Sequence, residues 1–106
     1  MSLSGKQKRF LRAEAHSLDP VVMIGKEGLT PTVVSAVQHA LHAHELIKVR
    51  VLESSPLERK EVSERLPAQT KSELAGQVGR VLILYKRHPQ EARIVLPRDS
   101  KGDSQA

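Results

Sequence analysis

The residues best suited to chemistry form a short glycine loop, Gly25-Lys26-Glu27-Gly28, between an apolar run and a helix start. A glycine at each end lets a ligand approach the backbone, because no Cβ stands in the way. The helix that begins at Thr30-Pro31 would add unpaired N–H groups and the positive end of its dipole, and Lys26 adds a mobile cation. The loop could therefore clamp a sugar–phosphate backbone. The alternative is a tight turn that needs glycine only for its backbone angles.

Two groups of cations could extend this site. Lys8, Arg9 and Arg12 recur along one side of a predicted helix, where a solvated surface is the alternative interpretation. Lys48 and Arg50 share one face of a predicted strand, and burial there without a partner would be costly. That face should therefore be open to water or meet an anion. The full set of candidate contacts is Gly25, Lys26, Glu27, Gly28, Thr30, Lys8, Arg9, Arg12, Lys48 and Arg50.

Other kinds of site find little support in the sequence. Without cysteine the chain has no thiolate ligand, thiol nucleophile or disulfide. His39 and His42 have a helical spacing compatible with a metal, but no carboxylate or thiolate partner is evident. The sequence contains neither a P-loop, nor a dinucleotide-binding glycine motif, nor a nucleophile elbow. We therefore predict no cofactor, no metal, no small-molecule substrate and no enzymatic activity.

The composition favours a polyanion as partner. The 106 residues suffice for one domain, and 17 Lys and Arg against 12 Asp and Glu give a net charge of +5. Residues 51–70 hold three basic and four acidic residues, so this segment is the least suited to face phosphates. Phe10 and Tyr85 are too few for a base-stacking platform, so RNA would be recognised by shape and phosphates. No apolar run could span a bilayer and no secretion signal is evident, so we expect a cytoplasmic protein.

Capping signals predict the three helices that would position these residues. The first begins at the capping box Ser4–Gln7 and is broken at Asp19-Pro20, because the residue before proline avoids the helical region. The second begins at Thr30-Pro31 and runs to about residue 44. The third begins at the capping box Ser55–Glu58 and should stop or kink at Pro67.

Apolar patterning predicts the strands. We expect them at residues 21–24, as a buried strand, at 46–51, 74–78 and 81–85, and as a short edge strand at 93–96. In the second strand Ile47, Val49 and Val51 should face away from Lys48 and Arg50. Gly79-Arg80 suits a hairpin between the third and fourth strands. The order α-β-α-β-α-β-β predicts an α/β (α+β) two-layer sandwich of helices on a mixed sheet of about four strands.

The quoted residues resemble a known family. The stretch Arg12–Thr30, RAEAHSLDPVVMIGKEGLT, is similar to the signature of the CRM domain, the chloroplast RNA splicing and ribosome maturation module, and so is His44–Arg50, HELIKVR. Gly79-Arg80, Leu84-Tyr85 and Ile94–Pro97 match its C-terminal part. The resemblance covers residues 3–97 as a single domain, and residues 98–106 are expected to be a flexible tail. A single domain with so little extension resembles the stand-alone bacterial YhbY-like members.

The resemblance implies a fold similar to the C-terminal domain of translation initiation factor three. It also implies binding of ribosomal RNA in precursors of the large subunit, and it places the family's glycine loop at Gly25–Gly28. On this interpretation Gly28→Asp should abolish RNA binding and leave the fold intact. We expect a monomer without membrane contact. The alternative is a basic adaptor that binds an acidic ribosomal or assembly protein through the same surface.

Overall fold

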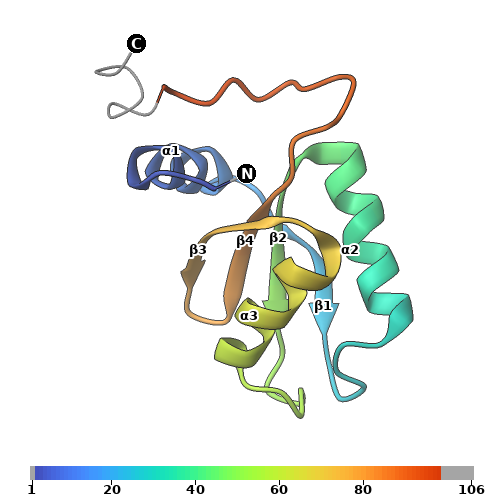
Figure 1. The fold of residues 1–106 in the computed structure, drawn as a ribbon. Coiled ribbons are helices and arrows are strands. Elements are labelled where there is room, and N and C mark those ends of the chain that lie inside the picture. Colours follow the sequence, from blue (N-terminus) through green and yellow to red (C-terminus); the bar gives the residue numbers. More distant parts are fainter. Residues whose placement is uncertain (1, 99–106) are drawn as a thin grey trace.

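Seven elements alternate along the chain in the order that the sequence predicts (Figure 1). The computed structural model describes residues 2–98, so the predicted tail lies outside the described residues from 99 onward. The elements are α1 (Gly5–Ala15), β1 (Pro20–Ile24), α2 (Pro31–His44), β2 (Leu46–Val51), α3 (Arg59–Thr70), β3 (Glu73–Val78) and β4 (Val81–Tyr85). Among residues 2–98 the longest helix has 14 residues, and none is long and apolar enough to cross a bilayer.

The starts of α1 and α2 are confirmed at the predicted capping residues. The backbone N–H of Gln7 donates to the Ser4 hydroxyl at 3.1 Å, and the Ser4 N–H donates to the Gln7 side chain at 3.0 Å. The N–H of Val33 donates to the Thr30 hydroxyl at 3.1 Å, with proline at the first helical position. In both helices a side-chain oxygen satisfies an N–H that has no partner within the helix.

The start of α3 differs from the prediction. The Ser55 hydroxyl accepts the N–H of Leu57 at 3.1 Å and donates to the Leu57 carbonyl at 2.9 Å. This local turn occupies the oxygen that was expected to cap the helix, so the predicted capping box is wrong. The helix begins at Arg59 instead, and the preceding Glu58 makes no capping hydrogen bond through its side chain.

Pro67 lies inside α3, so of the two predicted effects, a stop or a kink, the stop is wrong. Proline lacks the N–H that would bond to the carbonyl four residues back, but the turn after it is anchored by burial of Leu66 and Thr70. The Pro67 carbonyl then accepts the N–H groups of Lys71 and Ser72. Lys71 ends the helix in a left-handed conformation with φ of 55°.

The four strands form one mixed sheet in the order β1-β2-β4-β3. β1 and β2 are parallel, as the helical connection between them requires, whereas β4 is antiparallel to both of its neighbours. Residues 46–51 and 81–85 are confirmed as strands with the predicted bounds, and the hairpin at Gly79-Arg80 is confirmed with a Gly79 φ of 58°. β1 and β3 are the two edges, and each begins one residue earlier than predicted.

Helices cover both faces of this sheet, which adds a layer to the two that were predicted. The predicted combination of helices with a mixed four-stranded sheet is confirmed. On the front face α2 and α3 pack against Ile47, Val49 and Val51, as the strand pattern predicts. On the back face α1 packs through Leu11 against an apolar group that includes Ile83. The third layer forms because β2 and β4 carry apolar residues on both faces.

The segment after β4 is held by the buried carboxylate of Glu45, at the end of α2. The backbone N–H groups of His88, Arg93 and Ile94 donate to it at 2.9, 2.7 and 3.0 Å. The predicted strand at 93–96 is wrong, because this carboxylate takes N–H groups that a strand would need for pairing. The segment instead runs above α1 (Figure 1), and its Ile94 joins the core of the back face.

The same contacts set the charge of Glu45. Burial by itself would raise the pKa of this carboxyl group. The three backbone N–H donors and the nearby His88 outweigh burial and hold the pKa below its ordinary value. Glu45 therefore stays ionised and keeps its three N–H partners at neutral pH.

Candidate nucleic-acid interface

The glycine loop lies at the end of β1 that is farther from α1, at the bottom of Figure 1. The N–H of Gly28 donates to the Gly25 carbonyl at 3.0 Å, which closes a tight turn. Gly28 is buried and has a φ of 72°, and a Cβ there would lie 3.4 Å from the Pro56 ring. The conformation of this turn thus requires glycine at Gly28, as the structural alternative in the sequence analysis predicts.

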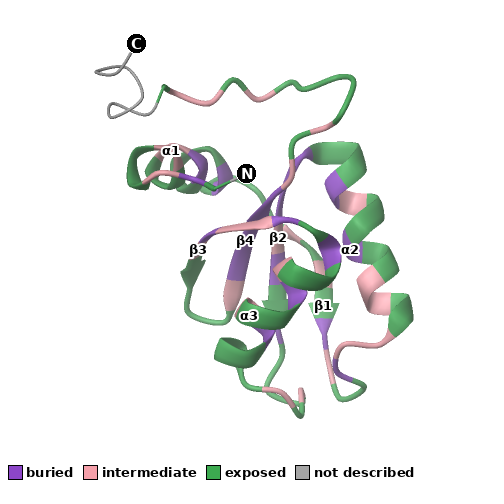
Figure 2. Ribbon diagram, in the orientation of Figure 1, coloured by how far each residue is buried: buried purple, intermediate pink, exposed green. Residues whose placement is uncertain are grey.

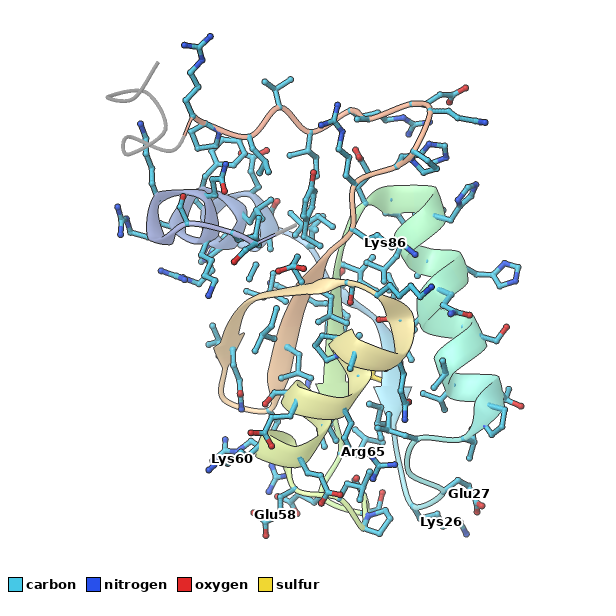
Figure 3. The ribbon with its side chains drawn as sticks, viewed as in Figure 1. Lys26, Glu27, Glu58, Lys60, Arg65 and Lys86 are labelled. Carbon is cyan, nitrogen blue, oxygen red and sulfur yellow. The ribbon has the colours of Figure 1, made fainter. Side chains whose placement is uncertain are left out.

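Gly25 has no such requirement. Its φ lies outside the left-handed range, and a Cβ would make ordinary contacts of 3.6 Å with the Ser54 hydroxyl and 3.7 Å with Leu52. Lys26 and Glu27 are exposed between the two glycines, and Figure 3 shows their side chains at the outer end of the loop. Lys26 and the backbone around Gly25 are therefore the parts of the loop that a ligand can reach.

We expect substitutions at the two glycines to differ in their effect on stability. Gly28→Asp should lower the free energy of unfolding by about 1 to 2 kcal/mol, because a side chain is strained at positive φ and crowds Pro56. Gly25→Ala should change it by less than about 0.5 kcal/mol. Urea unfolding of both variants measures the difference. Equal stabilities would contradict the assigned roles.

The expected loss of stability also revises the earlier prediction that Gly28→Asp leaves the fold intact. A loss of RNA binding in that variant would combine a loss of stability with any loss of contact. Gly25→Ala is the cleaner variant for the loop, since it adds a Cβ at accessible backbone without strain.

The neighbouring connection after β2 carries acidic residues as well as basic ones. The loop after β2 packs on the glycine loop through Ser54 and Pro56. That same connection carries Glu53 and Glu58, which line a shallow hollow together with Arg59 and Arg80. Segment 51–70, predicted to be the least suited to phosphate, is thus the neighbour of the glycine loop. The loop by itself has no excess of positive charge.

A denser group of cations lies on the back face of the sheet. Arg12, Lys48 and Arg50 line one hollow of about 470 Å³ beneath α1, together with His16. Three of the predicted cations thus share one site, although they come from a helix and a strand more than 30 residues apart. Asp19 is the one acidic residue among the residues that line this hollow.

The three cations are held differently. Lys48 is partly buried, and its ammonium group donates to the carbonyls of Leu18 at 2.9 Å and His16 at 3.3 Å, just beyond the end of α1. Arg12 donates to the Ala75 carbonyl at 3.2 Å. Arg50 is exposed and has no hydrogen bond or ion pair with any residue from 2 to 98. Arg50 is therefore the cation in the hollow whose donors are all available to a ligand.

The remaining predicted contacts lie elsewhere. Lys8 and Arg9 are exposed on α1, which Figure 1 shows at the opposite end of the sheet from the glycine loop. The Thr30 hydroxyl accepts the Val33 N–H as the helix cap, so its first role is structural. The candidate residues accordingly form two groups with the hollow between them, not one continuous patch around the loop.

This surface also has an apolar part that was not predicted from the sequence. The apolar run 21–24 was predicted to be a buried strand, and this is wrong for Val21 and Met23, which are about half exposed. β1 is an edge strand, and α1 leaves its end uncovered. A four-residue apolar run does not predict whether its strand is at an edge or in the middle of a sheet, because the sequence pattern is the same in both positions.

Two of the five histidines, His42 and His88, form a pair. The Nε2 atoms of His42 and His88 lie 3.3 Å apart. The N–H groups of Gln90 and Glu91 donate to His88 Nδ1, so a neutral His88 carries its proton on Nε2 and donates to His42. Within residues 2–98 no three His, Cys, Asp or Glu side chains gather closely enough to hold a metal ion. The pair joins α2 to the segment after β4.

Known proteins are similar to this chain along most of its length. The family model of the CRS1 / YhbY (CRM) domain matches residues 3–86. The "Probable RNA-binding protein YqeI" of Bacillus subtilis is 40% identical over 95 residues, which cover 90% of this chain and 99% of the relative. A protein of Haemophilus influenzae named "RNA-binding protein" is 42% identical over 97 residues, covering 92% and 97% of the two chains.

A solved structure shows the same fold. The solution structure of SAV1595 from Staphylococcus aureus, described as a candidate RNA-binding protein, aligns with a TM-score of 0.77 and 39% sequence identity. The alignment covers 90% of this chain and 99% of that one. The arrangement of three helices and four strands is therefore shared along nearly the whole length of both chains.

Proposed function

Since the chain belongs to the CRS1 / YhbY (CRM) domain family, we propose that it is a non-catalytic RNA-binding protein that associates with ribosomal RNA in precursors of the large subunit. The names of two similar proteins, from Bacillus subtilis and Haemophilus influenzae, support RNA as the ligand. The observation that carries the proposal is the hollow on the back face of the sheet, where Arg12, Lys48 and Arg50 gather around a single acidic residue.

The proposed path of the RNA joins the hollow to the glycine loop. Arg50 lies opposite Met23 in the sheet, two residues before Gly25. At about 3.3 Å per residue, the Gly25 backbone begins about 7 Å further along the strand. Lys26 then extends the cationic path around the end of β1. At the other end of the hollow, α1 adds Lys8 and Arg9.

Binding along this path would depend on phosphate contacts. Each Lys or Arg that neutralises a phosphate releases a condensed counterion, which makes the affinity fall with added salt. Lys48 already gives two hydrogen bonds to the carbonyls beyond α1, so part of its role is to position that end of the hollow. Arg50 offers a free guanidinium group with five donors, so we assign it the main phosphate contact.

Crosslinking in cells, followed by sequencing of the attached RNA, tests the ribosomal assignment. We expect the crosslinked reads to come from large-subunit precursors. Reads spread over messenger RNA or small-subunit RNA would contradict that target. Nuclease digestion of an extract tests the adaptor alternative, because a complex that survives complete removal of RNA is held by protein contacts.

A further inference from the structure

Residues 2–98 leave the lower half of the back face of the sheet uncovered. The strand pairings place Met23, Arg50, Val81 and Val78 in one row across all four strands. With neighbouring strands about 4.8 Å apart, this row is about 14 Å wide. α1 covers the other half of the face, and Figure 2 shows the end of β3 exposed. We call the row Met23, Arg50, Val81 and Val78 the open face.

The open face exposes apolar side chains around a cation. Met23 is 48% exposed and Val78 is 65% exposed. Leu18 and Val21, at the border of the same face, are 38% and 51% exposed. Val81 lines the hollow beside Arg50. Several exposed apolar side chains gathered on one face mark a binding site more often than single scattered ones do.

We propose that the open face binds unpaired nucleotides of the RNA. The bases lie on Met23, Val78 and Val81, and the planar guanidinium group of Arg50 contacts a base plane or its phosphate. This inference rests on the proposed RNA-binding function and specifies the form of RNA that the face accepts. The loop and α1 would contact the backbone on either side.

Unpaired RNA matches the chemistry of the face better than a duplex. In a duplex the bases are stacked and paired, and the outer surface consists of ribose and phosphate, which gain nothing from aliphatic side chains. An unpaired base presents a flat apolar surface that can lie on them. Because these side chains carry no hydrogen-bonding groups, the face should distinguish base sequences only weakly.

The charge of the surroundings favours RNA over a protein partner. The cations Arg12, Lys48 and Arg50 lie within or directly beside the apolar row. Charged residues other than arginine are depleted at the cores of protein interfaces, whereas Lys48 lies in this hollow. A polyanion with apolar faces, such as an unpaired RNA strand, matches apolar and cationic groups that alternate over this short distance.

The test compares the double variant Met23→Ser/Val78→Ser with the wild type. Both side chains are largely exposed, so the fold should tolerate the change. The matched control is Val95→Ser, because Val95 is 83% exposed in the segment above α1. The probes are a single-stranded oligouridine of about 12 nucleotides and an RNA duplex of similar length, each titrated at several salt concentrations.

We expect the double variant to bind oligouridine about tenfold more weakly with an unchanged salt slope, because apolar contacts are lost and phosphate contacts are kept. Its duplex affinity should change by less than about twofold, and the control should match the wild type. Unchanged oligouridine affinity, or an equal loss on both probes, would overturn the inference. If the wild type still binds RNA in a salt-dependent manner, the proposed function survives that result.

Two further outcomes distinguish a failure of the proposed function from a failure of this inference alone. If the wild type binds neither probe nor ribosomal RNA, the proposed function itself fails, and this inference fails with it. If the double variant keeps full RNA affinity but loses an acidic ribosomal protein that the wild type captures, the open face is a protein-binding surface. That result would overturn the assignment to unpaired RNA.

Discussion

Charge reversal at Arg50 is expected to weaken RNA binding by about 25-fold at about 0.1 M salt. One phosphate contact to single-stranded RNA contributes about 0.7 to the slope of log affinity against log salt, or about fivefold in affinity at that concentration. Arg50→Glu removes this contact and places a negative charge at the same point, which should cost about as much again. The salt slope should become shallower by about 0.7 or more.

Filter-binding titrations over a range of salt concentrations measure both quantities. The matched control is Lys60→Glu, which makes the same change in net charge on α3, on the front side of the sheet (Figure 3). The control should change affinity by less than about threefold, because only the general field of the protein is altered. Equal losses in the two variants would show that net charge alone attracts RNA and that the hollow is not its site.

The substitution Glu45→Gln should lower the free energy of unfolding by about 2 to 3 kcal/mol at neutral pH. The carboxylate accepts three backbone N–H groups, and hydrogen bonds to a charged acceptor are worth more than neutral ones. Glutamine has a single acceptor oxygen, and its amide would oppose an N–H donor. Chemical denaturation measures the loss. Glu91→Gln is the control, because Glu91 is exposed in the same segment.

Low pH should reduce the difference in stability between the wild type and Glu45→Gln. The pKa of Glu45 is lower in the folded protein than its ordinary value of 4.5. Its contribution to stability is therefore complete above pH 4.5 and is lost as the pH falls through the lower folded value. The wild type should lose more stability than Glu45→Gln over this range, so that the two curves approach each other. A gap that stays constant with pH would contradict the role of the charged carboxylate.

Local signals correctly predicted two of the three helix starts. Ser4 and Thr30 each cap a helix, because the side-chain hydroxyl accepts the backbone N–H three residues later. Both predicted helix starts are confirmed. Ser55 has the same local sequence signal, but its hydroxyl bonds within a turn and leaves the helix uncapped. The strand expected at 93–96 failed for a non-local reason, because Glu45, almost 50 residues earlier, takes its N–H groups.

Prediction of the candidate site was limited in the same way, by contacts between segments that are distant in the sequence. Lys48 and Arg50 stand two residues apart on one face of β2, and the sequence gives no reason to separate them. The structure separates them, because Lys48 donates to the carbonyls beyond α1 and Arg50 has no hydrogen bond with any residue from 2 to 98. The exposure of Met23 likewise depends on which strand forms the edge and on how far α1 extends. These are properties of the assembled sheet, which no single segment encodes.

The position of α1 also has a consequence for the order in which the chain acquires its structure. α1 is synthesised first, yet the strands it packs against, β2, β3 and β4, and the ammonium group that caps its end all come later in the chain. An isolated helix of 11 residues is only marginally stable in water. During translation the basic N-terminal segment must therefore remain undocked until the final hairpin has emerged, and it completes the back layer last.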